Sequence, residues 1–148
     1  MMNWFRSLFG GATAASSAQP GDPAELAAAA LLVQAALADG IYAEAEQTAI
    51  QTILTRSFSL SDEAAWALLD RAEGEAEAAS DHYRFTRDVM TLDESRRIAF
   101  VRHMFEVANA DGDACAFEDA FVRRVAGLLH VSDRDRAAAR AAAREGSA

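Results

Sequence analysis

The sequence contains no lysine, two prolines and a single cysteine. Because Cys115 has no second cysteine to pair with, an internal disulfide is excluded, which suits a reducing compartment. All 14 basic residues are arginines, which we attribute to coding bias. With so few prolines, long stretches of the chain lack the residue that most strongly disrupts a helix.

Long hydrophobic runs are also missing. The longest uninterrupted apolar stretch in the body of the chain, residues 26–33, ends at Gln34 and is far shorter than the ~20 residues of a membrane-spanning helix. No cleavable signal is evident, because Arg6 interrupts the N-terminal apolar patch and no long apolar segment follows it. We therefore expect a cytoplasmic protein, with a peripheral position at the inner membrane as the alternative.

Positive charge is scarce in one half of the chain. Residues 22–81 contain 12 acidic and 2 basic side chains, a net charge of −10, whereas residues 82–148 contain 11 of each. The whole chain has a formal charge of −9. A protein this acidic repels phosphate backbones, so we do not expect it to bind nucleic acid.

Alanine is abundant, with 36 residues, and β-branched residues are sparse, a composition that favours helix almost everywhere. The 148 residues suffice for one domain with a real core. Helix-start signals and helical apolar spacing predict an all-α fold, a compact bundle of about seven helices. The first runs from Pro23 to about Ala38 and the second from about Glu44 to Ser57; the others follow Ser61, Asp81, Thr91, the turn at 110–112, and Ser132.

Most of these helices have a predicted inner face. The first helix is apolar nearly all round, which is typical of a buried central helix. The other inner faces comprise Ala49, Ile50, Ile53 and Leu54 in the second helix, Trp66, Leu69 and Ala72 in the third, Ile98, Val101, Phe105 and Ala108 in the fifth, and Phe117, Phe121, Val125 and Leu128 in the sixth.

Residues 1–21 are predicted to be separate from the helical domain at 22–148. Residues 10–21 are small and read as a flexible linker. The apolar residues in front of it lie at helical spacing around Arg6 and are Trp4, Phe5, Leu8 and Phe9. Three alternatives are open for this segment: it docks onto the body, it docks onto a partner, or it makes a weak contact with a membrane surface. Its one basic residue gives little attraction to anionic lipid.

A short acidic phrase occurs twice, 72 residues apart. The first copy has Asp39 in Ala-Asp-Gly and Glu46 seven residues later, and the second has Asp111 in the same tripeptide and Glu118 seven residues later. Each copy lies between two apolar helical runs. The pattern predicts an internal pseudo-twofold repeat of helix, acidic turn and helix.

These acidic turns are candidate metal sites, because hard cations such as calcium prefer several oxygen ligands. The alternative is structural: the aspartates order the turns, and the glutamates favour the helix N-termini through the macrodipole. Neither loop has the twelve-residue pattern of an EF-hand. The candidate ligands for a divalent cation are Asp39 and Glu46 in the first turn, beside Glu44, and Asp111, Glu118 and Glu106 in the second, beside Asp113 and Asp119.

No catalytic constellation is evident in the sequence. His82, His103 and His130 are scattered, with no carboxylate or cysteine at ligand spacing. Cys115 has no basic neighbour to activate its thiol. The one glycine pair, Gly10-Gly11, follows no strand, and hydrolytic motifs are absent.

Several motifs, in order, resemble the TerB family of bacterial tellurite-resistance-associated proteins. They are the two Ala-Asp-Gly turns, the segment Phe58–Leu69, the stretch Ser80–Val89 and the final VRRVAGLLHVSDRD. The resemblance covers residues 22 to about 143. It implies a compact helical bundle with internal pseudo-symmetry, an association with resistance to tellurite and other stresses, and a domain that also occurs fused to J-domain co-chaperones.

The resemblance further implies cation binding at Asp39, Glu46, Asp111 and Glu118, with Glu106 beside them. The chain departs from the family at Gln34, where a glutamate is common. We therefore predict a non-enzymatic bacterial stress-response module that binds a protein partner of unknown identity and is linked to a divalent cation. The alternative is a metal-dependent enzyme, or a subunit of one, that uses the carboxylates of the acidic turns.

Overall fold

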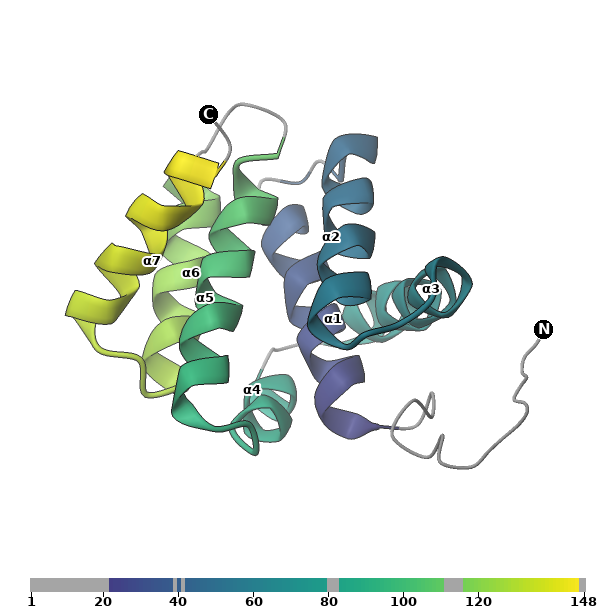
Figure 1. Ribbon diagram of the computed structural model, residues 1–148, viewed down its shortest axis with the longest axis horizontal. Helices are drawn as coiled ribbons and strands as arrows, with labels where there is room; N and C mark the ends of the chain where they lie inside the picture. Colours follow the sequence, from purple (N-terminus) through teal and green to yellow (C-terminus); the bar gives the residue numbers. More distant parts are fainter. Residues whose placement is uncertain (1–21, 39, 41, 80–82, 111–115, 147–148) are drawn as a thin grey trace.

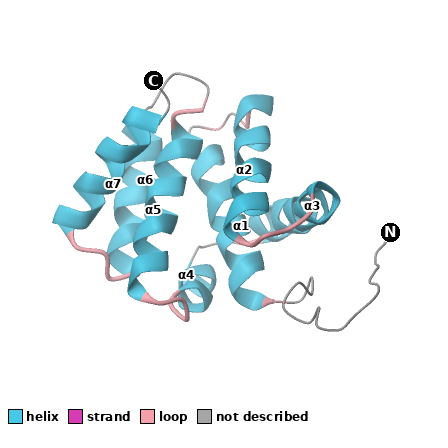
Figure 2. Ribbon diagram, in the orientation of Figure 1, coloured by secondary structure: helices cyan, strands magenta, loops and turns pink. Residues whose placement is uncertain are grey.

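A computed structural model describes residues 22–38, 40, 42–79, 83–110 and 116–146, with the side chains of 116–118 and 146 excepted (Figure 1). Within these residues the secondary structure is helical, without strands (Figure 2). The predicted all-α fold is therefore confirmed. The helices are α1 (Pro23–Leu37), α2 (Glu44–Ser57), α3 (Asp62–Ala78), α4 (Tyr83–Val89), α5 (Glu94–Ala108), α6 (Ala116–Leu128) and α7 (Asp133–Gly146).

Helix α1 is the centre of the bundle. It contacts α2, α3 and α4 and also α5 and α6, while α7 packs on the outside of α5. Figure 1 shows α2 and α3 on one side of α1, and α5, α6 and α7 on the other. The expectation of a buried central first helix is confirmed, because nine of its residues are buried, Ala27 to Val33 together with Ala35 and Ala36.

Local signals at both ends fix the position of α1. Asp22 accepts a hydrogen bond from the backbone N–H of Ala24 at 3.0 Å, and Pro23 occupies the first helical position. The helix ends at Leu37, and Gly40 has φ of +87°. That backbone conformation favours glycine, which is common just after the end of a helix.

The start of α5 differs from the sequence prediction. The side chain of Asp93, and not that of Thr91, accepts the capping hydrogen bond, from the backbone N–H of Arg96 at 2.9 Å. The hydroxyl of Thr91 instead donates to the carbonyl of Asp88 at 2.7 Å, at the end of α4. Because its hydroxyl bonds backwards along the chain, Thr91 belongs to the turn that precedes the helix.

Two predicted inner faces are confirmed only in part. In α3 the buried face is Ala65, Leu68, Leu69, Ala72 and Ala76, and Trp66, predicted to face inward, is 44% exposed. Leu69 and Ala72 are buried as predicted, so the prediction for α3 is wrong at Trp66 alone. In α6 the buried residues include Val122, Val125, Ala126 and Leu129.

The predicted repeat and domain boundary fall on residues outside the described ranges. Residues 39, 41 and 111–115 belong to the two acidic turns, and residues 1–21 form the predicted N-terminal unit. The pseudo-twofold superposition of the turns and the separate N-terminal unit therefore stay predictions.

Candidate functional site

The described part of the first acidic turn is organised by Glu46. This carboxylate is 1% exposed, and its Oε1 accepts a hydrogen bond from the backbone N–H of Ala43 at 2.9 Å. Glu46 is the third residue of α2, so the contact satisfies a backbone donor that the helix itself leaves unpaired. The geometry gives Glu46 the structural role that the sequence analysis kept as an alternative to metal binding.

A second carboxylate reaches this turn from α3. Glu73 Oε2 accepts hydrogen bonds from the hydroxyl of Tyr42 at 2.7 Å and from Nε2 of Gln47 at 2.8 Å. The pKa of the Tyr42 phenol is raised, mainly by burial. The hydrogen bond and the charge of Glu73 raise it further, and the charge of Glu46 adds a smaller effect. The phenol therefore keeps its proton and acts as the donor. The sequence analysis missed Glu73, because its partners lie 26 and 31 residues away.

Most of the other predicted ligands have no described side chain. Asp39 and Asp111 lie outside the described residues, and Glu118 lies in α6 with its side chain not described. Glu106 lies in α5, where its Oε2 accepts from Arg102 at 3.1 Å and its Oε1 lies 3.0 Å from Nδ1 of His103. In the part of the chain that is described, no three His, Cys, Asp or Glu side chains converge on a metal position.

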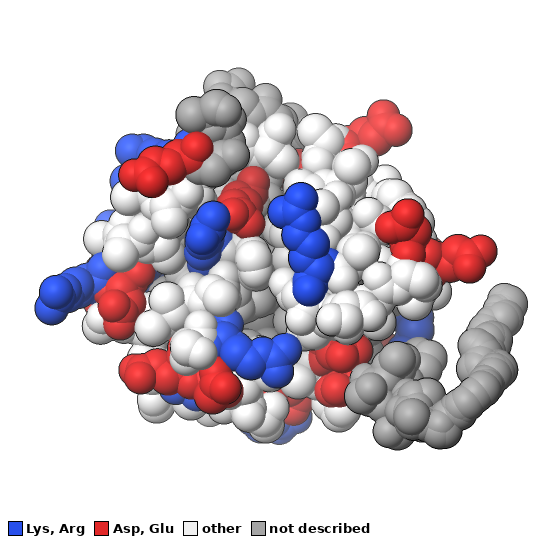
Figure 3. All heavy atoms as spheres, in the orientation of Figure 1, with Lys and Arg blue, Asp and Glu red and all other residues white. Residues whose placement is uncertain are grey.

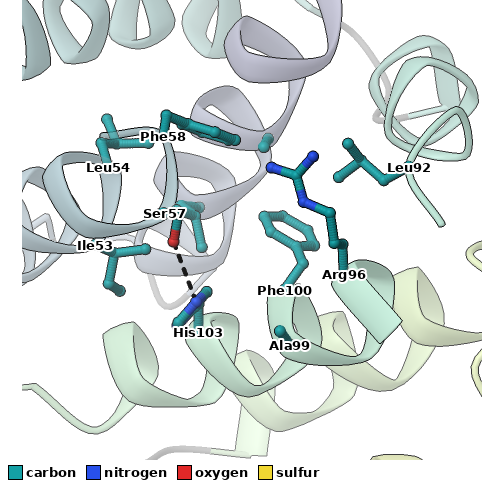
Figure 4. Close-up of a pocket in the computed structure, with 11 residues that line it drawn as sticks. Ile53, Leu54, Ser57, Phe58, Leu92, Arg96, Ala99, Phe100 and His103 are labelled. Atoms are coloured by element: carbon teal, nitrogen blue, oxygen red, sulfur yellow. Dashed lines mark hydrogen bonds between the residues drawn. The ribbon is translucent and has the colours of Figure 1, made fainter. Parts of the chain in front are cut away.

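A pocket of about 180 Å³ lies between α1, α2 and α5 (Figure 4). Most of its wall is apolar, and its polar side chains are Ser57, Arg96 and His103. The remaining lining residues are Ala28 and Leu32 from α1, Ile53, Leu54 and Phe58 from the end of α2, Leu92, and Ala99 and Phe100 from α5.

One wall of the pocket holds a chain of hydrogen-bonding groups. Ser57 Oγ lies 3.2 Å from Nε2 of His103, whose Nδ1 lies 3.0 Å from Glu106 Oε1. An ionised carboxylate only accepts, so Nδ1 carries a proton, and in the neutral ring Nε2 accepts from the hydroxyl of Ser57. The hydroxyl hydrogen of Ser57 is then committed to His103, and its oxygen remains an acceptor.

The order hydroxyl, imidazole and carboxylate is the one used by enzymes with an activated serine. Acyl transfer also requires donors aimed at the oxyanion that forms next to the nucleophile. Ser57 is the last residue of α2, where the helix presents carbonyl oxygens and partial negative charge. This environment opposes an oxyanion, so the geometry favours a hydrogen-bonding role for the three groups over a nucleophilic one.

Arg96 supplies the positive charge of the pocket. Figure 4 shows its guanidinium between Phe58 and Leu92, with Phe100 between it and the Ser57–His103 pair. No carboxylate among the described residues forms an ion pair with it. The charge of Arg96 acts instead on Glu25 of α1, where it lowers the pKa of the carboxyl. Burial and the charge of Asp22 have the larger effect and raise that pKa to about 7.

The pocket was not predicted from the sequence. His103 and Glu106 are three residues apart on α5, a spacing that places two side chains on one helix face, so this pair had a local signal. Ser57 is 46 residues from His103, and nothing in either local segment indicates that they meet.

The described helices provide no segment long and apolar enough to cross a membrane. With the fold and both candidate sites in view, comparison with protein families shows that residues 25–141 match the model described as tellurite resistance protein TerB. The chain belongs to the TerB family. The match confirms the resemblance seen in the sequence and extends from α1 to α7, so both the first acidic turn and the pocket lie within the TerB domain. No curated protein and no solved structure matches the chain.

Proposed function

We propose that this TerB-family chain is a non-enzymatic stress-response protein of the bacterial cytoplasm that acts by binding a basic protein partner through its acidic half. The observation that supports this proposal is the uneven charge: residues 22–81, which include α1, α2 and α3, have a net charge of −10. Figure 3 shows acidic side chains on the α2–α3 side of the molecule. The exposed carboxylates of these helices are Glu44, Asp62, Glu63, Asp70 and Glu77.

A surface of one charge attracts a partner of the opposite charge and speeds the encounter, and salt screens this attraction. Few basic side chains can neutralise the acidic half, because residues 22–81 contain only Arg56 and Arg71. Among the described residues, Glu75 of α3 pairs with Arg84 of α4, at the edge of this surface. The acidic surface is thus well suited to arginine or lysine side chains of a second protein.

The acidic turns add a proposed link to divalent cations. Crowded carboxylates repel one another, and a bound cation relieves that repulsion. Glu46 and Glu73 both act on Tyr42, so two carboxylates lie close to the first turn. Glu106 fits a cation less well, because both of its oxygens already contact Arg102 and His103. The alternative function, a metal-dependent enzyme, requires a metal with an open coordination position.

The test is co-purification from the native cell at low salt, with charge variants of the bait. The double variant Glu63→Gln/Asp70→Asn removes two exposed charges from α3 and should retain less of the partner. The matched control Glu94→Gln/Asp133→Asn removes two exposed charges from the starts of α5 and α7 and should retain as much as wild type. Equal retention by all three baits, or retention that does not fall with added salt, would contradict partner binding through the acidic half.

A further inference from the structure

We propose that the pocket between α1, α2 and α5 is a binding site for a small aromatic carboxylate, with the ring among the apolar side chains and the carboxylate on Arg96. This proposal goes beyond the partner-binding function, because it concerns a different surface of the molecule and a different class of ligand. It rests on the size of the pocket, its apolar wall, and the placement of its polar groups.

The size of the pocket selects a ligand with one ring. Its volume is about 180 Å³, and an apolar cavity of roughly 150 Å³ suffices to bind benzene. A single ring with one small substituent therefore fills it. Leu32, Leu54 and Phe100 are buried in the protein and provide a preformed apolar wall.

The polar groups on the two sides of the pocket differ in charge and in hydrogen-bonding character, and this difference sets the orientation of the ligand. The guanidinium of Arg96 offers a planar set of donors that suits a carboxylate. Because burial raises the pKa of the neighbouring Glu25 carboxyl to about 7, that residue neutralises Arg96 only in part at neutral pH. Arg96 therefore remains an attractive position for an anion.

The opposite side of the pocket does not favour an anion. While His103 is neutral, the hydroxyl of Ser57 donates to His103, and the Ser57 oxygen presents lone pairs. Glu106 beyond the ring adds negative charge. A carboxylate at this end would meet acceptors, so the anionic group is directed to Arg96 and the ring lies against Phe100 (Figure 4).

The N-terminal segment of the chain is a less suitable occupant. Residues 1–21 have aromatic side chains of the right size, namely Trp4 and Phe5, but they contain Arg6 and no acidic residue. The segment therefore offers no anion to Arg96. A small carboxylate satisfies both the apolar wall and the positive charge, and we commit to that class.

The test uses two probes with the same ring, benzoate and benzyl alcohol, on the full chain. Calorimetry and amide chemical shifts measure affinity and location. Benzoate should bind with Kd on the order of 1 mM, as a fragment of this size does. It should bind about threefold more tightly than benzyl alcohol, because an ion pair with the exposed Arg96 side chain adds only a modest attraction. Shifts should concentrate at Ser57, Phe58 and Phe100.

Variants separate the pocket from general attraction to arginine. Arg96→Gln should abolish the preference for benzoate while benzyl alcohol binds as before, and the control Arg123→Gln, an exposed arginine of α6, should change neither. Ala99→Phe adds bulk to the pocket wall and should weaken both probes. Circular dichroism establishes that each variant is folded.

The proposal is overturned if benzoate does not bind or binds no better than benzyl alcohol. It is also overturned if Arg123→Gln lowers the benzoate affinity as much as Arg96→Gln, or if Ala99→Phe weakens neither probe. If Trp4→Ala/Phe5→Ala in the full chain increases the affinity for both probes equally while Arg96→Gln has no effect, the occupant is the chain's own N-terminal segment. None of these outcomes depends on a protein partner.

Discussion

Glu25 is predicted to destabilise the protein at neutral and alkaline pH, and Glu25→Gln should reverse this effect. The carboxyl lies in the first turn of α1, where burial, and then the charge of Asp22, raise its pKa from the ordinary 4.5 to about 7. The native state thus binds the proton more tightly than the unfolded chain does. Glutamine has nearly the same shape and no charge, so it imitates the protonated carboxyl over the whole pH range.

The sign follows from proton linkage. Between pH 4.5 and about 7, the native state holds more protons at Glu25 than the unfolded state holds, so the free energy of unfolding falls as pH rises. Below pH 4.5 both states are protonated there, and above about pH 7 the loss is complete. The full shift corresponds to roughly 3 kcal/mol. Because Glu25 is only half-buried, solvent screening reduces the expected effect to about 1–2 kcal/mol.

The assay is urea unfolding of wild type and Glu25→Gln at pH 4.5, 6 and 8. The difference in unfolding free energy should be near zero at the lowest pH and should favour the variant by about 1–2 kcal/mol at pH 8. Glu94→Gln is the matched control, because Glu94 is an exposed acidic residue in the first turn of α5. It removes a similar helix-dipole interaction without the burial, so its difference should not come to favour the variant as pH rises.

A result of the opposite sign would refute this reasoning. If Glu25→Gln becomes less stable than wild type as pH rises, the carboxylate forms a favourable charged interaction, with Arg96 as the neighbour that would supply it. A difference that does not vary with pH would show that Glu25 titrates alike in both states. Either outcome would also change the electrostatic account of the pocket, since Arg96 would then be neutralised by Glu25.

Three further predictions concern the turns and the N-terminus. Gly40→Ala should lower the free energy of unfolding by about 1 kcal/mol, because φ is positive there and the added methyl group would meet no atom. Gly74→Ala, inside α3, should raise the free energy of unfolding, and urea unfolding measures both variants. Deletion of residues 1–20 should leave helical content and Tm nearly unchanged, and a large loss of stability would place Trp4 in the core. Millimolar calcium should raise the Tm of wild type more than that of Asp111→Asn/Glu118→Gln, and equal shifts would place the ions elsewhere.

The helices could be predicted from the sequence because their ends are determined locally. Asp22 and Pro23 start α1, and the prediction for α2 agrees with its observed bounds, Glu44–Ser57. The rotation of each helix was less predictable, since it depends on packing with neighbours far away in the sequence. Trp66 has the apolar character of an inner residue, yet the smaller Ala65 occupies the inner position of α3.

The two candidate sites differ in the same way. Glu46 and its turn were visible in the sequence because the residues that define them lie close together along the chain. The contacts of this turn were not visible in the sequence, since Glu73 of α3, which bonds to Tyr42, lies 31 residues further along the chain. In the pocket only the His103–Glu106 pair had a local signal, because Ser57 and His103 meet only when α2 packs beside α5.

The position of the pocket gives its occupancy a consequence for the whole bundle. Helix α2 belongs to the acidic half of the chain and α5 to the half with no net charge, and the Ser57–His103 contact joins them across the pocket. A ligand held there contacts both helices and α1, so it binds only when the two halves are packed together. Binding to the native state alone raises the free energy of unfolding in proportion to the logarithm of ligand concentration. The proposed carboxylate therefore acts as a stabiliser of the contact between the halves, and a given concentration of benzoate should raise Tm more in wild type than in Ala99→Phe.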